Sequence, residues 1–251
     1  MRVSPEEVAE GVHRIADGAV NWYIVEEDGR VALYDAGWPR SWSRVEEALA
    51  ALSYDPGSVE AVVLTHGHPD HLGAAEDVRV NLGARVLAHE PEVDRVKGQA
   101  PGSSPWTLVP GLSLQLWRPP ALGFVLGATV RGFLMPKWVK EVESFASDAT
   151  LDVPGRPRVI PTPGHTEGHV SFELSDRGVL IAGDAIVTRD PVTGAPGPCL
   201  THDTVASSPD QVRRSLGNLE SSTADVLATG HGDPWRGSMR EAVAAVRERD
   251  S

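Results

Sequence analysis

Cysteine is almost absent from this sequence. Cys199 is the only one among 251 residues. A single thiol cannot form an intramolecular disulfide framework, and it excludes a zinc site built mainly from cysteines. We therefore expect a reducing compartment, the cytoplasm, and we expect Cys199 to be an inert thiol.

Basic residues are also scarce. Lys and Arg number 23 against 35 Asp and Glu, so the formal net charge is -12. An excess of negative charge opposes binding to nucleic-acid backbones and to anionic lipid surfaces. The composition thus predicts no nucleic-acid partner.

Long apolar runs are missing as well. The most apolar segment, 121–135, is interrupted by Arg131 and by glycines, and it is shorter than the roughly 20 residues that span a bilayer. The first residues are acidic where a signal peptide would have a basic region followed by an apolar one. We expect neither a membrane span nor export.

The rest of the sequence alternates strand-like and helix-like patterns. Apolar, β-prone runs predict strands, and apolar residues three or four apart predict helices. The predicted strands cover 12–16, 21–25, 31–34, 61–65, 85–88, 158–161, 169–174, 179–182 and 225–228. The predicted helices cover 42–52, 74–82, 209–219 and 239–249. We expect a single domain over 1–251 that contains a helical insertion at about 112–149.

A dense cluster of metal-ligand side chains follows the predicted strand 61–65. Its members are His66, His68, Asp70 and His71. Neutral imidazole offers a nitrogen lone pair near pH 7, and carboxylates add charge and oxygen donors. Four such groups within six residues, directly after a buried strand, are difficult to explain as packing. This pattern predicts a metal site.

Three further candidate ligands follow later predicted strands. They are His165, Asp184 and His231, and each lies next to a glycine. Glycine allows backbone conformations that a Cβ atom would obstruct, which suits a crowded metal site.

These residues resemble the metallo-β-lactamase fold superfamily, whose motif His-x-His-x-Asp-His followed by His, Asp and His is matched at all seven positions. The resemblance extends over nearly the whole chain and implies a four-layer αββα sandwich, with the ligands at one edge of two central sheets. It also implies two metal ions, one held by His66, His68 and His165, the other by Asp70, His71 and His231, with Asp184 bridging them. The run 34–37 resembles the family's Asp-x-Gly turn, so Asp35 would orient a ligand histidine.

The implied ligand set favours hydrolysis. Two divalent ions about 3.5–4 Å apart can bind one water, lower its pKa towards about 7 and polarise a carbonyl oxygen. We therefore predict attack by a metal-bound hydroxide, with Asp70 orienting it. A nitrogen and oxygen ligand set suits zinc, iron or manganese, and zinc is our expectation.

The superfamily resemblance leaves the substrate open, because the same site serves several reactions. We expect a small ester, lactone or thioester, and β-lactamase activity that is at most incidental, because no cysteine occupies the second metal's ligand set. Glyoxalase II-like enzymes carry a longer C-terminal region than the twenty residues after His231. Acyl-homoserine lactonases use a tyrosine after the bridging aspartate, whereas all three tyrosines here precede the first motif. The alternatives are a mononuclear-iron oxidoreductase resembling persulfide dioxygenases, and a metal-binding scaffold without turnover.

The insertion offers the substrate clue. It combines large apolar side chains with several basic ones. Such a segment suits a lid over a partly hydrophobic small molecule, and the alternative is a pair of helices that packs on the core or forms a homodimer interface. The candidate pocket residues are Phe124, Phe133, Trp138 and His202. We expect structural roles for the remaining histidines, His13, His89 and His169.

Overall fold

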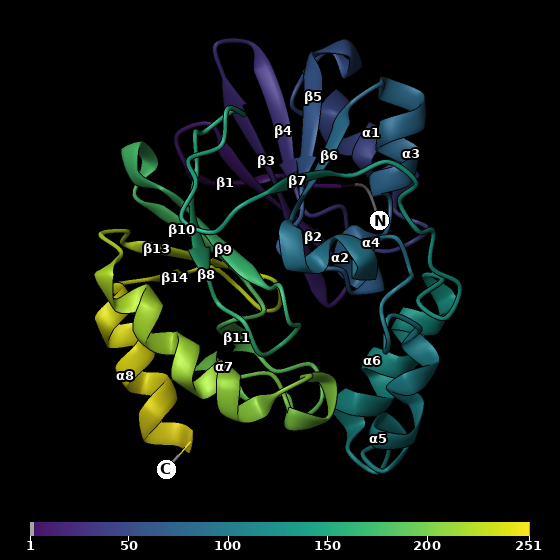
Figure 1. The fold of residues 1–251 in the computed structure, drawn as a ribbon, viewed down its shortest axis with the longest axis vertical. Coiled ribbons are helices and arrows are strands. Elements are labelled where there is room, and N and C mark those ends of the chain that lie inside the picture. The colour runs from purple at the N-terminus through teal and green to yellow at the C-terminus, as the bar shows by residue number, and fades with distance from the viewer. Residues whose placement is uncertain (1–2, 251) are drawn as a thin grey trace.

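Two β-sheets packed face to face form the centre of the molecule, and the computed structural model describes residues 3–250 (Figure 1). The first sheet has seven strands in chain order: β1 (Glu6–Ala9), β2 (Val12–Asp17), β3 (Val20–Glu27), β4 (Arg30–Tyr34), β5 (Val59–Val63), β6 (Arg85–His89) and β7 (Glu143–Phe145). The second sheet has the order β14 (Trp235–Arg236), β13 (Val226–Thr229), β10 (Val179–Gly183), β9 (Val170–Leu174) and β8 (Arg158–Pro161). A separate hairpin pairs β11 (Val187–Arg189) with β12 (Pro196–Cys199).

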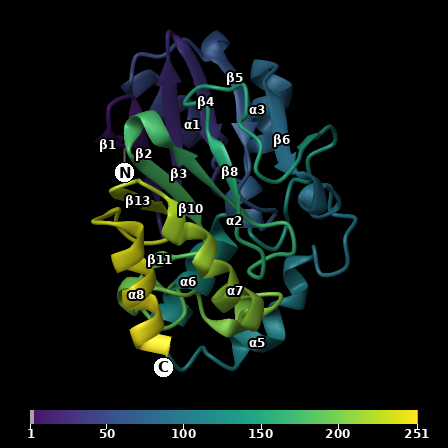
Figure 2. The same cartoon turned by 60° about the vertical axis from the view of Figure 1, so that its left-hand side comes forward.

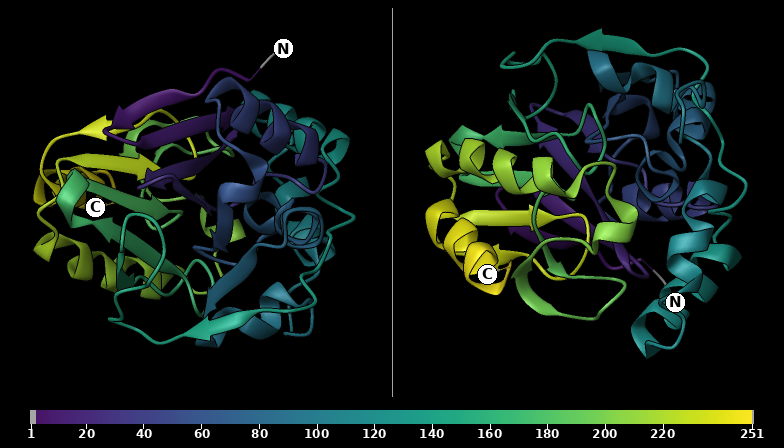
Figure 3. Two further views of the ribbon diagram at one scale, coloured as in Figure 1. Left: turned by 90° about the horizontal axis from the view of Figure 1, so that it is seen from above. Right: turned by 60° about the horizontal axis from the view of Figure 1, so that its bottom comes forward.

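Helices cover the outer face of each sheet. On the first sheet, α1 (Trp42–Ala51) and α3 (Ala75–Leu82) bury Val45, Leu49 and Val78 in an apolar cluster with strand residues such as Leu33. On the second sheet, α8 (Met239–Asp250) buries Val243 and its apolar neighbours in a cluster that includes strands β10 and β13. Figures 2 and 3 show these two sets of helices on opposite sides of the paired sheets.

The space between the sheets is filled by apolar side chains from both. Tyr34 of the first sheet and Phe172 of the second meet edge to face, with their ring centroids 5.5 Å apart. The four layers are therefore helix, sheet, sheet and helix, which confirms the predicted αββα sandwich.

The carboxyl ends of several strands meet at one edge of the sandwich. Strands β4 and β5 are parallel neighbours in the first sheet, and β10 and β13 are parallel neighbours in the second. Because parallel strands end at the same edge, the segments that follow them come together. Six of the seven predicted ligands lie in these segments, and His165 follows β8.

The insertion differs from its predicted bounds of 112–149. Its helical part begins earlier, with η3 (Pro105–Thr107) and α5 (Val109–Ser113), and ends with α6 (Pro119–Val130). The later residues 143–145 form β7, which pairs with β6 at the edge of the first sheet. Strand β7 has three residues, of which only Phe145 is buried. A strand this short does not show a recognisable alternation of apolar and polar residues.

Other differences concern short elements. The helix expected over 209–219 is α7 (Pro209–Ser215) continued by a 3₁₀ turn, Leu216–Ser221. Strands β1, β11, β12 and β14 have no more than four residues each and were not predicted. Within residues 3–250, no helix combines the length and hydropathy that a membrane span requires.

Candidate metal centre

The seven predicted ligands lie at the common edge of the two sheets. The segment after β5 carries the first four of them, and α2 (Pro69–Leu72) holds two of these four on one short turn. Pro69 occupies the first position of this helix, where a missing N–H costs nothing. The remaining three follow β8, β10 and β13. All seven side chains are buried, namely those of His66, His68, Asp70, His71, His165, Asp184 and His231.

The structure brings these side chains together in three overlapping groups. In each group, the candidate donor atoms lie within 4.8 Å of one another; the groups are His66, His68 and His165, then His66, His71 and Asp184, then Asp70, His71 and His231. The carboxylate of Asp184 lies between them, since its Oδ2 is 3.3 Å from His165 Nε2 and 3.2 Å from His231 Nε2. The result is one candidate metal-binding region to which all seven side chains contribute.

Two buried atoms at this centre have no hydrogen-bond partner within residues 3–250. They are Nε2 of His71 and Oδ1 of Asp184, which lie 3.4 Å apart. Leaving such atoms unpaired in the interior is costly, so native structures rarely do so without a further ligand. A divalent cation would satisfy both atoms, and the residues therefore fit a metal site.

Burial sets the protonation of most histidines here. Burial and the neighbouring imidazoles hold the pKa values of His66 and His68 well below the usual range. Burial likewise lowers the pKa of His165 to about 4. These three imidazoles are therefore neutral, which is the form that binds metals.

At His71, neighbouring carboxylates outweigh the influence of burial on the pKa. Burial would lower its pKa, but the carboxylates of Asp184 and Asp35 raise it to about 10. In turn, although burial would raise the pKa of Asp184, the surrounding histidines hold it well below the usual range. Asp184 is thus an ionised carboxylate at the centre of the site.

Asp35 contacts the ligand histidine His71 directly. Nδ1 of His71 lies 2.8 Å from Asp35 Oδ2, and the backbone N–H of Thr65 donates to Asp35 Oδ1 at 2.8 Å. Asp35 adopts a left-handed backbone conformation, with φ 61°, which aspartate tolerates better than most residues. This arrangement directs the other ring nitrogen of His71 into the metal region.

Other ligand histidines are held in the same way. Nδ1 of His231 donates to the carbonyl oxygen of Ala19 at 2.6 Å, and Nδ1 of His165 lies 3.1 Å from Thr201 Oγ1. Such contacts fix the ring orientation and the tautomer of a ligand.

Glu92 is a functional candidate that sequence patterns did not reveal. Its side chain is buried, and its two carboxylate oxygens accept hydrogen bonds from the backbone N–H groups of Gly67 at 2.9 Å and Gly168 at 2.8 Å. It therefore ties the loop of His66 and His68 to the loop that follows His165. Glu92 ends a Glu-Pro-Glu run, a composition typical of an exposed turn, so no local signal pointed to this role.

His169 also supports the site without facing the metal region. Its Nε2 accepts a hydrogen bond from the backbone N–H of Asp184 at 3.1 Å, and its Nδ1 lies 2.8 Å from Thr162 Oγ1. His13 and His89 lie elsewhere and contact Tyr54 and Ser147. Cys199 is buried, and burial raises its thiol pKa to about 11.

Two of the four predicted pocket residues lie beside the ligands. Phe124 and Phe133 line a small cavity together with five of the seven ligand side chains. Trp138 and His202 do not line this cavity. Trp138 packs against the apolar cluster of the first sheet, whereas Nδ1 of His202 accepts a hydrogen bond from the backbone N–H of Thr204 and caps a 3₁₀ turn.

Comparison with known proteins points to one family. A family model described as the metallo-beta-lactamase superfamily matches residues 15–231. The probable metallo-hydrolase YflN of Bacillus subtilis (strain 168) is 28% identical over 252 residues, which cover 92% of this chain and 87% of YflN.

Solved structures of metallo-beta-lactamase proteins also resemble this chain. A metallo-beta-lactamase family protein from Thermus thermophilus is 28% identical, with a TM-score of 0.63 over 92% of this chain and 74% of that one. The subclass B3 metallo-beta-lactamase BJP-1 of Bradyrhizobium japonicum superposes with a TM-score of 0.68 over 98% of this chain and 91% of its own. Because BJP-1 is only 17% identical, that likeness shows the fold alone.

Proposed function

Because the chain belongs to the metallo-β-lactamase superfamily, we propose that it is a metal-dependent hydrolase of a small ester, lactone or thioester that uses two divalent metal ions, with zinc as the expected metal. The observation that carries this proposal is the buried ligand cluster, in which His71 Nε2 and Asp184 Oδ1 have no hydrogen-bond partner within residues 3–250. A scaffold without metal chemistry would have no need to bury these groups unsatisfied. The single cysteine supports the cytoplasm as its location.

In this proposal, the candidate ligands are shared between two metal ions. His66, His68 and His165 would hold one ion, and Asp70, His71 and His231 would hold the other. Asp184 faces both sets and would bridge them. Bound metal ions supply two effects, a lower pKa of coordinated water and polarisation of the substrate carbonyl.

Asp70 would orient the attacking water. Its carboxylate is buried in the wall of the cavity, and its Oδ2 lies 3.8 Å from His231 Nε2 and 4.0 Å from His71 Nε2. Burial raises the pKa of Asp70, which makes this carboxylate a better proton acceptor than an exposed one.

The apolar wall of the cavity would exclude water from the reaction. Leu112, Phe124 and Phe133 line the same cavity as the ligands. A dry site strengthens the interaction of the developing negative charge with nearby cations.

A substrate panel on protein of known metal content tests this proposal. Esters, thioesters, lactones and β-lactams are assayed with zinc-loaded protein, with His66→Ala as the matched control. We expect turnover of at least one ester, lactone or thioester, slow or absent turnover of β-lactams, and no turnover by the variant. Activity that survives His66→Ala would place the chemistry elsewhere, and inactivity of metal-loaded protein across the panel would favour a scaffold.

A further inference from the structure

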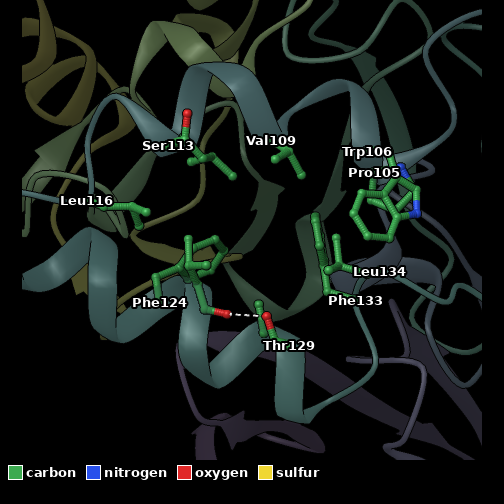
Figure 4. A pocket seen from close by; sticks show the side chains of 12 residues that line it. Pro105, Trp106, Val109, Ser113, Leu116, Phe124, Thr129, Phe133 and Leu134 are labelled. Carbon is green, nitrogen blue, oxygen red and sulfur yellow. Dashed lines mark hydrogen bonds between the residues drawn. The ribbon is translucent and has the colours of Figure 1, made fainter.

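An apolar cavity of about 170 Å³ lies within the helical insertion, next to the metal centre. Figure 4 shows Val109 and Ser113 of α5 facing Phe124 and Thr129 of α6 across the space, with Leu116 at one end and Phe133 near the other. We call this space the chain cavity. Its lining residues are Pro105, Trp106, Val109, Leu112, Ser113, Leu116, Phe124, Val125, Ala128, Thr129, Phe133 and Leu134.

The walls of the chain cavity offer little to a polar ligand. None of these lining residues carries a charge, and two carry hydroxyl groups. The hydroxyl of Ser113 donates to the carbonyl oxygen of Pro110 at 2.8 Å, and that of Thr129 donates to Val125 at 2.8 Å. Both hydroxyls are thus satisfied by their own helices. A polar occupant would lose its bonds to water without replacement, so the cavity suits an apolar one.

The chain cavity shares part of its wall with the cavity at the metal centre. Leu112, Phe124 and Phe133 line both the chain cavity and the small ligand-lined cavity. The ring centroid of Phe124 lies 6.1 Å from that of the ligand histidine His231. A molecule with its reacting carbonyl beside the ligands could therefore extend an attached chain past Phe124.

The chain cavity also opens to solvent. Trp106 is 60% exposed and Leu116 is 37% exposed, so apolar surface continues from the cavity to the outside of the insertion. Exposed apolar surface that leads into a concave site is characteristic of ligand entry.

We propose that the chain cavity binds an aliphatic chain of the substrate, so that the protein prefers esters or thioesters with a medium-length apolar chain over acetyl esters. This inference rests on the proposed function and specifies its substrate class. In the reaction, the water oxygen bonds to the carbonyl carbon, the bond from that carbon to oxygen or sulfur breaks, and the released alcohol or thiol takes a proton. The chain lies on either the acyl side or the alcohol side of that bond.

Two substrate series distinguish these sides. One series varies the acyl chain from two to ten carbons with a constant p-nitrophenol leaving group, and the other varies the alcohol chain of acetate esters. We expect kcat/KM to rise by up to about fourfold for each added methylene in one series, because burying a CH₂ group is worth about that factor, and then to level off. Turnover of short esters with no dependence on chain length in either series overturns the inference but leaves the proposed function intact.

Two variants on α6 test whether the preference for longer chains arises in the chain cavity. Thr129→Phe fills the chain cavity, whereas Val130→Phe adds the same ring to a neighbouring side chain that is 70% exposed and does not line the cavity. We expect Thr129→Phe to lower the ratio of long-chain to short-chain kcat/KM by about tenfold or more, and Val130→Phe to leave that ratio unchanged. Equal effects of the two variants would contradict the assignment.

Direct binding keeps the inference testable if no ester is hydrolysed. Octanoate, below its micelle concentration, and acetate are titrated into metal-loaded protein by calorimetry. We expect octanoate to bind at least tenfold more tightly than acetate to the wild type, and this preference to disappear in Thr129→Phe. Equal binding of the two carboxylates, or burial of the cavity in a dimer that excludes octanoate, overturns the inference.

Discussion

At the scale of single residues, Asp35 shows how a side chain outside the ligand set can control metal binding. Its carboxylate accepts a hydrogen bond from the Nδ1–H group of His71, which leaves Nε2 available to bind a metal. We expect Asp35→Asn to weaken metal binding about 10- to 100-fold, because an amide neither fixes this tautomer nor increases the basicity of the ring. Competition with a chelator of known affinity measures the effect.

Asp148 provides the matched control for this substitution. It shares the left-handed backbone conformation, with φ 60°, but its side chain is exposed and away from the ligands. Asp148→Asn should leave metal affinity unchanged. The same affinity in wild type and Asp35→Asn would show that Asp35 merely shapes its turn.

Replacement of Asp70 should separate metal binding from turnover. The amide of Asp70→Asn retains an oxygen donor but is a far weaker proton acceptor than the carboxylate. We expect the variant to keep its metal at saturating zinc while kcat falls on the order of 10²-fold. Metal analysis and kinetics on the same samples test this, with the exposed Asp176→Asn as control. Full turnover with both metals bound would refute the role.

At the scale of elements, the close approach of α2 to the Gly37–Trp38 segment positions Asp70 and His71. A Cβ atom added at Gly73 would overlap the carbonyl groups of Gly37 and Trp38. We expect Gly73→Ala to destabilise the metal-loaded protein by about 3 kcal/mol, because overpacking in a core forces the backbone apart.

Gly123 is the control for this substitution. It lies inside α6 with no atom within 4 Å of an added Cβ. Gly123→Ala should be neutral or stabilising by about 0.5–1 kcal/mol, because alanine favours a helix over glycine. Chemical denaturation measures both variants, and a Gly73→Ala protein as stable as wild type would disprove the close-packing argument.

Glu173 links β8, β9 and the segment after η6 (Leu216–Ser221). Its carboxylate pairs with Arg158 at 2.5 Å and accepts hydrogen bonds from Ser222 Oγ at 2.6 Å and Thr223 N at 2.9 Å. Burial would raise the pKa of this carboxyl, but these partners outweigh it and hold the pKa below its ordinary value of 4.5.

A lowered carboxyl pKa stabilises the folded protein above the unfolded-state pKa, and this stabilisation disappears as the pH falls through the folded-state pKa. We expect Glu173→Gln to lower the free energy of unfolding by roughly 1–3 kcal/mol at pH 7, and the difference from wild type to shrink below about pH 4. Denaturant titrations at both pH values test this, with the exposed Glu46→Gln of α1 as control. A deficit that is constant with pH would exclude the ionised carboxylate as its source.

Sequence patterns predict those elements whose signal is local. Strand β5 and the ligands after it are evident because an apolar run is followed directly by His66 and its neighbours. Glu92 could not be found in this way, since its partners Gly67 and Gly168 are distant in sequence and contribute only backbone N–H groups. The sequence likewise could not show that Trp138 packs on the cluster of the first sheet, because an aromatic residue in an apolar insertion gives no indication of which cluster it joins.

At the scale of the whole molecule, the two sheets each supply part of the metal centre. The first sheet positions the ligands from His66 to His71, and the second positions His165, Asp184 and His231. The sheets are also joined at this edge by the backbone, where the N–H of Val170 donates to the carbonyl of Thr65 at 3.0 Å. Metal binding would therefore stabilise the association of both halves as well as create the reactive site.

The most direct test of this account is a zinc titration of metal-free protein, in which bound metal per chain and turnover of an ester or thioester are measured in the same samples. We expect turnover to rise with bound zinc and to level off at two ions per chain, as the proposed division of the ligands between two ions requires. Full turnover without bound metal would contradict the account. So would an iron-loaded protein that consumes oxygen with a persulfide while the zinc-loaded protein hydrolyses nothing.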